Sequence, residues 1–339
     1  MRVEQFNYPL PDSAIAQKAI EPRHRARLLD TGDMSDHTFL DLAARLRAGD
    51  LVVVNETRVR AARLRGHRSA TGGEVELLLL GRREDGSWEA LARPAHRLRP
   101  DVVIELDQMQ AVVRSNPVNG VVQVDLVGVD DVERVIEETG EVPLPPYFKG
   151  HLDDASRYQT MFARTAGSAA APTAGLHFTT EVVDRLTAAG IEIASVDLHV
   201  GIDTFRPIQV EEIERHRMHR EWCSITPETA SRIRATRRSG GRVVAIGTTV
   251  ARTLESFAND DGTVGEGRME TDLFLKPGDR FHVVDVLVTN FHVPGSTLIV
   301  LVAAFMGERW RLAYQTALER GYRFLSFGDA MMAEWSGVS

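Results

Sequence analysis

Short apolar runs that end in polar residues recur near the start of the chain and through its second half. Residues 51–54 are all apolar and are followed by Asn55, and similar runs occupy residues 191–200, 243–246 and 284–289. A run of this kind is typical of a strand buried on both faces of a sheet. Stretches with helical character lie between the runs, at residues 39–48, 180–189, 227–239, 249–257 and 297–306. The alternation predicts an α/β domain whose sheet is barrel-like or mainly parallel.

A different pattern occupies residues 63–149. Its apolar segments are short and regularly spaced, and turn residues such as Asp85-Gly86 and Asn119-Gly120 separate them. Short strands with frequent turn signals favour a small antiparallel β-barrel. We therefore expect a discontinuous α/β catalytic domain, formed by residues 1–62 and 150–339, that is interrupted by an inserted β-barrel domain at 63–149.

The composition is that of an ordinary globular protein, with 43% hydrophobic and 26% charged residues in 339 and a formal net charge of -8. The single cysteine, Cys223, cannot form an intrachain disulfide or a multi-thiolate metal site. The amino terminus has no apolar signal-peptide core, and the longest apolar run, 298–306, is shorter than the ~20 residues that span a bilayer. We expect a soluble cytoplasmic protein without membrane association, either monomeric or weakly oligomeric.

Arginines gather in two runs of the first hundred residues, which carry 17 basic against 14 acidic residues. The first run holds Arg58, Arg60, Arg63, Arg65 and Arg68, and the second holds Arg93, His96, Arg97 and Arg99. Such runs are typical of a surface that contacts nucleic-acid phosphates. The chain has 37 arginines and only three lysines, so the clustering also reflects its composition.

The segment from Ala171 to Phe178 combines a proline, a glycine and a histidine in eight residues. Pro172 and Gly175 oppose both a continuous helix and a central strand, so the segment is predicted to be an ordered loop. One interpretation is a functional loop that approaches a ligand closely and presents His177. The other is a tight connection in which His177 is buried and hydrogen-bonded.

Polar residues follow the predicted strands at five places. They are Asn55, His199, the pair Thr248 and Thr249, Asn290 with His292, and Asp329 after an expected strand at 324–327. Ligands of α/β proteins bind at the carboxyl ends of strands, so these residues are candidate site residues. Gly247 and the two threonines suit an anion at a helix start, and a simple threonine N-cap is the alternative.

Histidines allow a metal-dependent hydrolase as an alternative function. His216 and His219 stand three residues apart beside Glu221, and together with His177, His199 and His292 they could hold a metal if the segment is helical. The spacing matches no defined metal motif. A non-catalytic RNA-binding protein is a further alternative.

Motifs from one end of the chain to the other resemble those of the S-adenosylmethionine:tRNA ribosyltransferase-isomerase family. They include NETRV at 55–59, PLPPY at 143–147, APTAGLHF at 171–178, HVG at 199–201, GTT at 247–249, TDLF at 271–274, TNFH at 289–292 and GDAM at 328–331. The chain differs from the usual family pattern at Glu56, where aspartate is usual, at Asp203, where glycine is common, and at Arg220, where serine is frequent.

The resemblance implies an α/β domain interrupted by a small β-barrel, and a transferase reaction. The ribosyl moiety of S-adenosylmethionine is transferred to 7-aminomethyl-7-deazaguanine at the wobble position of tRNA and is isomerised to give epoxyqueuosine, while adenine and methionine leave. S-adenosylmethionine is consumed as a substrate, and neither a cofactor nor a metal is expected.

The reaction needs a base near the 5′ carbon and an acid for the departing adenine, and histidine suits both tasks at neutral pH. The candidate catalytic residues are His177, His199, His219, Glu221 and His292. Tyr158 and Phe178 are candidates for stacking on a base. The remaining substrate-binding candidates are Thr173, Gly175, Asp203, Thr248, Thr249, Asn290 and Asp329. The candidate contacts to tRNA phosphates are Arg58, Arg60, Arg63 and Arg206.

Overall fold

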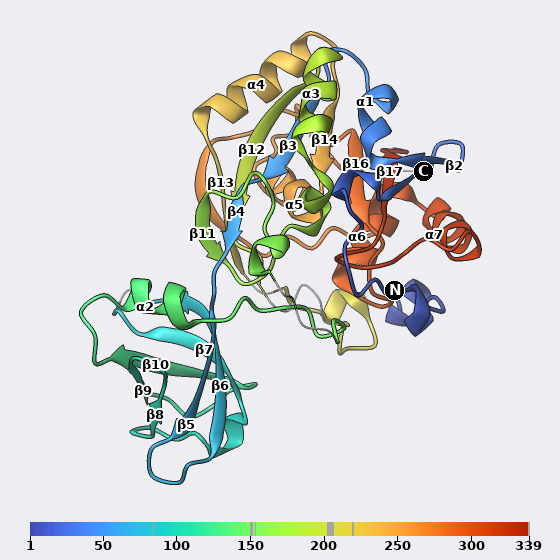
Figure 1. Ribbon diagram of the computed structural model, residues 1–339. Helices are drawn as coiled ribbons and strands as arrows, with labels where there is room; N and C mark the ends of the chain where they lie inside the picture. The colour runs from blue at the N-terminus through green and yellow to red at the C-terminus, as the bar shows by residue number, and fades with distance from the viewer. Residues whose placement is uncertain (84, 150–151, 153, 202–206, 219, 338–339) are drawn as a thin grey trace. The chain divides into compact units, whose positions relative to one another are not determined.

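The computed structural model describes the whole chain except residues 84, 150, 151, 153, 202–206, 219, 338 and 339. Its contacts divide the chain into two compact units (Figure 1). The first unit comprises Met1–Arg58, Pro145–Thr165 and Ala171–Ser339, and the second comprises Val59–Leu144 with Ala166–Ala170. Against the insert expected at 63–149, the second unit begins and ends a few residues earlier and gains a short returning segment.

A nine-stranded mixed sheet forms the centre of the first unit. Its four central strands are parallel neighbours in the order β12, β3, β14, β16, and β17 runs antiparallel to β16. In sheet order the strands are β15 (Gly267–Thr271), β13 (Glu221–Ile225), β12 (Glu192–Leu198), β3 (Leu51–Asn55), β14 (Val243–Ile246), β16 (Val286–Asn290), β17 (Ala330–Glu334), β1 (Arg27–Asp30) and β2 (Ser35–Thr38). The predicted mainly parallel sheet is confirmed for these central strands.

Two apolar cores cover the two faces of this sheet. Alternate residues of β3 point to opposite sides, so that Leu51 and Val53 pack in one core and Val52 and Val54 in the other. The covering helices are α1 (Leu42–Arg45), α3 (Thr180–Ala188), α4 (Pro227–Arg238), α5 (Thr248–Ser256), α6 (Thr297–Met306) and α7 (Arg309–Glu319). All ten residues of α6 are buried, which explains its continuous apolar sequence.

The second unit contains a closed antiparallel barrel of six strands, as predicted (Figure 1). Side chains that alternate along each strand fill its interior, among them Leu64, Leu77, Trp88 and Ile104. Around the barrel the strands are β10 (Val121–Val127), β7 (Trp88–Arg93), β6 (Glu74–Arg82), β5 (Arg63–Arg68), β8 (Val103–Glu105) and β9 (Gln110–Val113). Helix α2 (Val132–Thr139) belongs to the same unit.

Short elements complete the described structure. Strands β4 (Thr57–Val59) and β11 (Thr165–Ser168) form a two-stranded sheet. The 3-10 helices are η1 (Val3–Phe6), η2 (Asp12–Ala14), η3 (Arg23–Arg25), η4 (Phe39–Asp41), η5 (Ala95–Arg97), η6 (Ala155–Tyr158), η7 (Thr173–His177) and η9 (Ile213–Arg215). Across the described ranges, every helix is too short or too polar to cross a membrane.

Two local predictions are wrong, and the described residues next to His216 do not form the helix on which the metal-site alternative depended. Residues 324–327 are not a strand, because Leu325 has a left-handed φ of 69° and the chain turns there; the strand is β17, which follows Asp329. The helix expected at 39–48 is reduced to η4 and the four residues of α1, since Leu46 is already extended. Residues 216–218 and 220 are not helical, and Glu221 begins β13.

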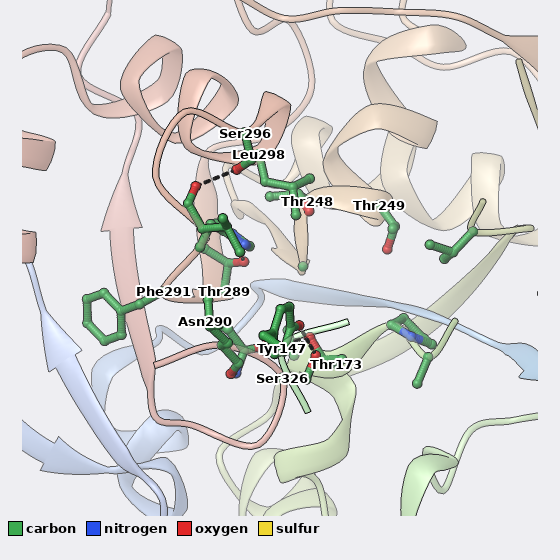
Figure 2. A pocket seen from close by; sticks show the side chains of 18 residues that line it. Tyr147, Thr173, Thr248, Thr249, Thr289, Asn290, Phe291, Ser296, Leu298 and Ser326 are labelled. Atoms are coloured by element: carbon green, nitrogen blue, oxygen red, sulfur yellow. Dashed lines mark hydrogen bonds between the residues drawn. The ribbon is translucent and has the colours of Figure 1, made fainter. Parts of the chain in front are cut away.

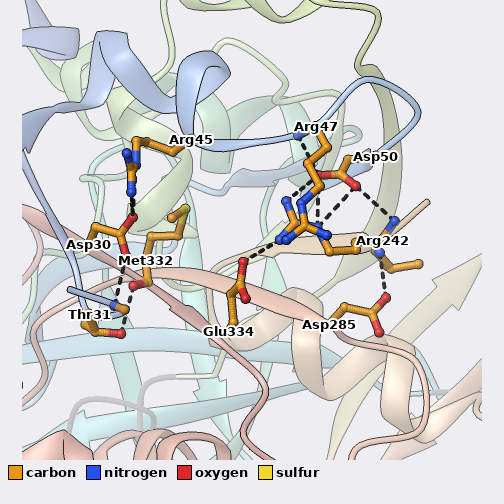
Figure 3. Close-up of polar contacts among 11 residues, drawn as sticks. Asp30, Thr31, Arg45, Arg47, Asp50, Arg242, Asp285, Met332 and Glu334 are labelled. Carbon is orange, nitrogen blue, oxygen red and sulfur yellow. Dashed lines mark hydrogen bonds and ion pairs between the residues drawn. The ribbon is translucent and has the colours of Figure 1, made fainter. Parts of the chain in front are cut away.

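An ion-pair network ties together the starts of three neighbouring parallel strands (Figure 3). Asp50 precedes β3 and accepts hydrogen bonds from the Arg242 guanidinium at 2.7–3.3 Å, while Arg242 precedes β14 and also pairs with Glu334 at the end of β17. Asp285, which precedes β16, accepts from the Val243 amide at 2.8 Å. Burial would raise the pKa of Asp50, but hydrogen bonds from Arg242 and from the Arg47 amide outweigh it and lower that pKa.

We predict that Asp50→Asn lowers the free energy of unfolding by about 3 kcal/mol at pH 7, because it leaves the mostly buried Arg242 without its main counter-charge. Since the folded-state pKa of Asp50 is lowered, its contribution is present above the unfolded-state pKa and is lost as the pH falls through the folded value. Urea unfolding at pH 7 measures the difference.

The matched control is Asp12→Asn. Asp12 pairs with Lys149 at 2.9 Å, but its side chain is 82% exposed. An exposed pair of this kind contributes little, so no measurable change is expected. Equal losses in the two variants would contradict a structural role for the buried network.

Candidate functional site

A pocket lies at the carboxyl ends of β14 and β16, away from the strand starts that carry the ion-pair network. Figure 2 shows the side chains that line it. Its empty volume is about 540 Å³, part of which is open to solvent. It is lined by Tyr147, Ala171, Pro172, Thr173, Ala174, Val200, Gly247, Thr248, Thr249, Thr289, Asn290, Phe291, His292, Val293, Ser296, Leu298, Leu325 and Ser326. Of the strand-end candidates, Thr248, Thr249, Asn290 and His292 line this pocket, whereas Asn55, His199 and Asp329 are not among its lining residues.

The turn from β14 into α5 presents backbone amides to the pocket. Gly247 is the N-cap of α5 and has a φ of 95°, a conformation that side chains disfavour. A Cβ at this position would lie 3.4 Å from the Cβ of Ala174, so glycine also permits close approach of the loop. No side chain caps the helix, which makes the alternative of a threonine N-cap wrong. The first-turn amides are available for an anionic ligand group.

The Asn290 side chain connects three segments around the pocket. Its Oδ1 accepts a hydrogen bond from Thr173 Oγ1 at 3.0 Å. Its Nδ2 lies 3.2 Å from His177 Nε2 and donates to the backbone carbonyls of Leu325 and Asp329 at 3.3 and 3.4 Å. Because protein groups engage both ends of the amide, Asn290 holds the walls of the pocket together.

His177 is buried and neutral. Since Nδ2 of Asn290 is a donor, His177 Nε2 accepts, and its Nδ1 proton points toward the Arg23 carbonyl. Burial lowers the pKa of His177 to about 4, although nearby Asp329 opposes the shift. The ring packs on Phe39 at 4.9 Å between centroids. Of the two interpretations of the 171–178 segment, the structure favours the buried, hydrogen-bonded histidine for this side chain.

His292 lines the pocket directly. Its Nε2 lies 3.0 Å from Thr289 Oγ1, and burial lowers its pKa to about 3. Tyr314 accepts a hydrogen bond from the His292 amide at 3.1 Å, and Tyr8 donates to its carbonyl. The imidazole is thus a neutral group held in place at the wall of the pocket.

His199 and Asp197 form a partly exposed pair at the carboxyl end of β12. His199 Nε2 lies 3.2 Å from Asp197 Oδ2, and the His199 side chain is 25% exposed. If Nε2 carries the proton that Asp197 accepts, Nδ1 remains as the second nitrogen for proton transfer. The next residue, Val200, lines the pocket.

Glu221 is bound by protein groups instead of facing the pocket. It pairs with Arg252 of α5, and both side chains are at least 95% buried. It also accepts from the Gly201 amide at 2.6 Å, which fixes the chain next to Val200. Arg252 in turn donates to the Leu273 carbonyl at 3.2 Å. The sequence interpretation missed Arg252, because an arginine inside a helix carries no signal of burial.

Asp329 is likewise engaged inside the protein. Its two carboxylate oxygens accept from the Arg27 and Arg323 amides at 3.0 and 2.8 Å, and from the Arg323 guanidinium at 3.1 Å. These bonds close the turn that ends at β17, and the residue is only 2% exposed. Asp329 therefore stabilises the turn and lies close to His177, and it is not among the residues that line the pocket.

The two aromatic candidates lie in the apolar interior. Tyr158 is fully buried with its ring 5.8 Å from that of Phe327, and Phe178 packs edge-on against Phe39 and Phe162. Neither lines the pocket. Gly175 also lies behind it, where a Cβ would come within 3.0 Å of the Thr160 side chain.

Two hydroxyl groups of the pocket were not predicted. Tyr147 Oη and Ser326 Oγ lie 2.6 Å apart, and both residues line the pocket (Figure 2). Burial raises the pKa of the Tyr147 hydroxyl above its usual range. The PLPPY motif at 143–147 is the only sequence signal for Tyr147. Ser326 has none, because the left-handed turn at Leu325 that places it has no signature in the sequence.

The predicted arginine contacts differ in their surroundings. Arg60 pairs with Glu133 at 3.3 Å and lies over the Trp88 ring, and Arg63 approaches Glu76 at 3.7 Å. Arg58 is half-buried. The remaining candidates Arg206, Asp203 and His219 lie outside the described residues.

The histidines proposed as a metal-binding set do not converge where the structure describes them. His216 packs against the Phe274 ring, with 5.6 Å between ring centroids. Among the described residues, no three side chains of the His, Cys, Asp and Glu types form a possible metal site. The geometry thus gives no support to the hydrolase alternative.

Comparisons with known proteins agree with this arrangement. The family model described as "Queuosine biosynthesis protein" matches residues 3–333. Proteins from Moorella thermoacetica and Symbiobacterium thermophilum, each named S-adenosylmethionine:tRNA ribosyltransferase-isomerase, are 48% identical over 98% of this chain and 99% of their own. A crystal structure of S-adenosylmethionine tRNA ribosyltransferase from Thermotoga maritima has a TM-score of 0.54 and 35% identity, covering 97% of this chain and 99% of that one.

We predict that the protein loses stability as the pH falls from 7 to 5. The unfolded chain binds protons at histidines near pH 6.5, whereas folded His177 and His292 stay neutral down to about pH 4 and 3. Each histidine then accounts for about 2 kcal/mol of the loss. Urea unfolding at both pH values should show a smaller loss for His177→Gln than for the wild type; an unchanged difference would contradict a neutral buried His177.

We also predict strong energetic coupling between Glu221 and Arg252. Glu221→Gln and Arg252→Met each leave a buried group unpaired, and each should cost about 3 kcal/mol of unfolding free energy. The double variant should cost at least about 2 kcal/mol less than the sum of the single variants. The exposed pair Arg220 and Glu270, 3.4 Å apart, is the control and should show coupling near zero; additive losses at Glu221 and Arg252 would contradict the pairing.

Proposed function

The chain belongs to the S-adenosylmethionine:tRNA ribosyltransferase-isomerase family, and from this premise we propose how its pocket serves the family's reaction. The protein is a transferase and isomerase of queuosine biosynthesis that modifies tRNA. The observation that carries this assignment is the similarity over nearly the whole chain to relatives of that name, at up to 48% identity. The hydrolase and the non-catalytic RNA-binding alternatives are not retained.

The ribosyl moiety of S-adenosylmethionine is transferred to 7-aminomethyl-7-deazaguanine in tRNA and isomerised to the epoxycyclopentanediol of epoxyqueuosine. In our proposal S-adenosylmethionine enters as a substrate, and adenine and methionine leave. We propose that the protein needs no resident cofactor or metal, that it acts in the cytoplasm, and that it is a monomer or weak oligomer.

We propose that the methionine carboxylate of S-adenosylmethionine binds at the start of α5. Gly247, Thr248 and Thr249 line the pocket there, and the positive end of the helix dipole favours an anion. Hydroxyl groups of Thr173 and of other lining residues would hydrogen-bond the ribose or the base. Tyr158, Gly175 and Phe178 are proposed to support the loop from behind, since they lie in the interior.

The proton transfers are assigned by exposure and by the partners already present. Proton removal at the 5′ carbon next to the sulfonium, and proton delivery to adenine, require groups that reach the substrate. We assign the His199–Asp197 pair to proton transfer, because His199 directly precedes the lining residue Val200, is partly exposed and keeps one nitrogen free of Asp197. His292, a neutral imidazole at the wall, is proposed to accept a hydrogen bond from the substrate.

The other acid and base candidates take positioning roles in this proposal. His177, Glu221 and Asp329 are saturated by protein partners and are buried. His177 fixes the Asn290 amide, Glu221 fixes the chain at Gly201, and Asp329 fixes the turn before β17. In this proposal Glu221 holds Arg252 and the Gly201 amide and does not itself contact the substrate.

The test is to incubate the protein with S-adenosylmethionine and tRNA bearing the aminomethyl-deazaguanine. We expect release of adenine and methionine and formation of the modified nucleoside. His199→Asn should lower kcat by about 10²–10⁴-fold, because it removes a proton-transfer group, while KM for S-adenosylmethionine changes little. Chromatography of adenine and of the tRNA nucleosides measures both quantities.

His37→Asn provides a matched control. His37 is a half-buried histidine on edge strand β2 whose Nε2 lies 2.8 Å from Ser35 Oγ, and it should retain wild-type kcat. Absence of adenine release by the wild type would refute the proposed function. Full kcat in His199→Asn would refute only the role of His199.

A further inference from the structure

An acid-free basic segment lies on the barrel at residues 93–99. Arg93, His96, Arg97 and Arg99 are all exposed, and no acidic residue occurs between Glu89 and Asp101. Residues 59–144 as a whole hold 11 arginines against 15 acidic residues, a net charge of -4. The segment is therefore a local reversal of charge in an acidic unit.

The other barrel arginines are mostly neutralised by carboxylates. Besides Arg60 and Arg63, Arg65 lies 3.2 Å from Glu141, and Arg134 lies 2.8 Å from Glu138. Arg83 and Arg114 pair in the same way with Glu89 and Asp125. A phosphate would have to compete with these carboxylates for the same N–H donors.

The arginines of the 93–99 segment keep most of their N–H donors free of carboxylates. Within the described part of the chain, no carboxylate lies within 4.0 Å of Arg93, Arg97 or Arg99. Arg97 Nε donates to His96 Nε2 at 3.3 Å, and Arg99 Nη1 donates to the Leu98 carbonyl at 2.9 Å. Glu76 stands opposite Arg93 on β6, but it is already approached by Arg63 and Arg65.

The backbone of this segment is held by the barrel. Arg93 ends β7 and points outward, since the interior positions of that strand are Trp88, Ala90 and Ala92. Leu98 is fully buried and anchors the segment between Arg97 and Arg99. The basic side chains are thus presented on a fixed support, which reduces the entropy lost when they bind a partner.

We propose that residues 93–99 form a contact surface for the phosphate backbone of the tRNA substrate. This inference rests on the proposed function and specifies which residues of the barrel unit bind the tRNA. Arginine forms bidentate hydrogen bonds with phosphate. Several neighbouring arginines with free N–H donors can contact several phosphates of one nucleic-acid chain, which a single small anion does not offer. No large apolar side chain is exposed between residues 93 and 99, which favours RNA over insertion into a lipid surface.

The test compares two triple variants of the full-length protein. Arg93→Gln, Arg97→Gln and Arg99→Gln together remove the proposed contacts. The control combines Arg83→Gln, Arg114→Gln and Arg134→Gln, which changes the charge of the same unit equally at exposed arginines that are paired with carboxylates. Kd for tRNA is measured by filter binding over a range of salt concentrations.

We expect the 93–99 variant to weaken tRNA binding by at least about 10-fold and to lower the slope of log K against log salt by about 2, because about three phosphate contacts are lost. The control should change Kd less than about 3-fold. Adenine release at saturating tRNA should stay at the wild-type level in both variants, since neither lies in the pocket.

Equal losses in the two variants, or no loss in either, would overturn the inference. Loss of binding to phosphatidylserine vesicles without a change in tRNA affinity would overturn it in favour of a membrane contact. A further outcome is that the two variants differ in tRNA affinity as expected while the wild type releases no adenine. That result would refute the proposed function and leave the proposed tRNA-binding surface supported.

Discussion

The pairing of Asp50 with Arg242 sets the register on which the rest of the first unit depends. Asp50, Arg242 and Asp285 each precede one of the adjacent parallel strands β3, β14 and β16, and their bonds fix where those strands begin (Figure 3). Because the three strands have similar lengths, fixing their starts also fixes where their carboxyl ends emerge. The polar residues after those ends are brought to one edge of the sheet by this constraint.

At the carboxyl ends of the strands, the Asn290 amide holds neighbouring segments together, as the Asp50–Arg242 pair does at the strand starts. It joins the end of β16 to the 171–178 segment, which is not part of the sheet, and to the turn at 325–329 that leads into the neighbouring strand β17. A buried amide with both ends satisfied has one favourable orientation, and it also dictates which nitrogen of His177 carries the proton. The pocket is therefore shaped by buried polar bonds, and only a few of its polar groups are left for substrate.

The sequence was sufficient for the parts of the fold that carry continuous apolar runs. Strands β3, β14 and β16 and helices α3 to α6 were predictable because their burial leaves a periodic signal. Strand β17 was misplaced because the left-handed conformation of Leu325 is imposed by the turn and has no signature in a leucine. At the site, Thr248, Asn290 and His292 could be found as strand-end residues. The burial of His177, Tyr158 and Phe178 could not, since a buried and a ligand-facing side chain of the same type look alike in one sequence.

The sequence alone also does not show which arginines are paired with carboxylates. Neither arginine run contains an acidic residue in sequence, yet Arg60 and Arg63 face glutamates that the chain supplies from distant positions, whereas Arg97 and Arg99 do not. Long-range pairing decides how many N–H donors a guanidinium can offer to a ligand, and such pairing is created only by the closed barrel. Net charge sets the long-range field of the unit, but the unpaired arginines determine where a polyanion can form short, directional contacts. An acidic protein can in this way bind an acidic substrate, provided that its carboxylates are engaged by some arginines and kept away from others.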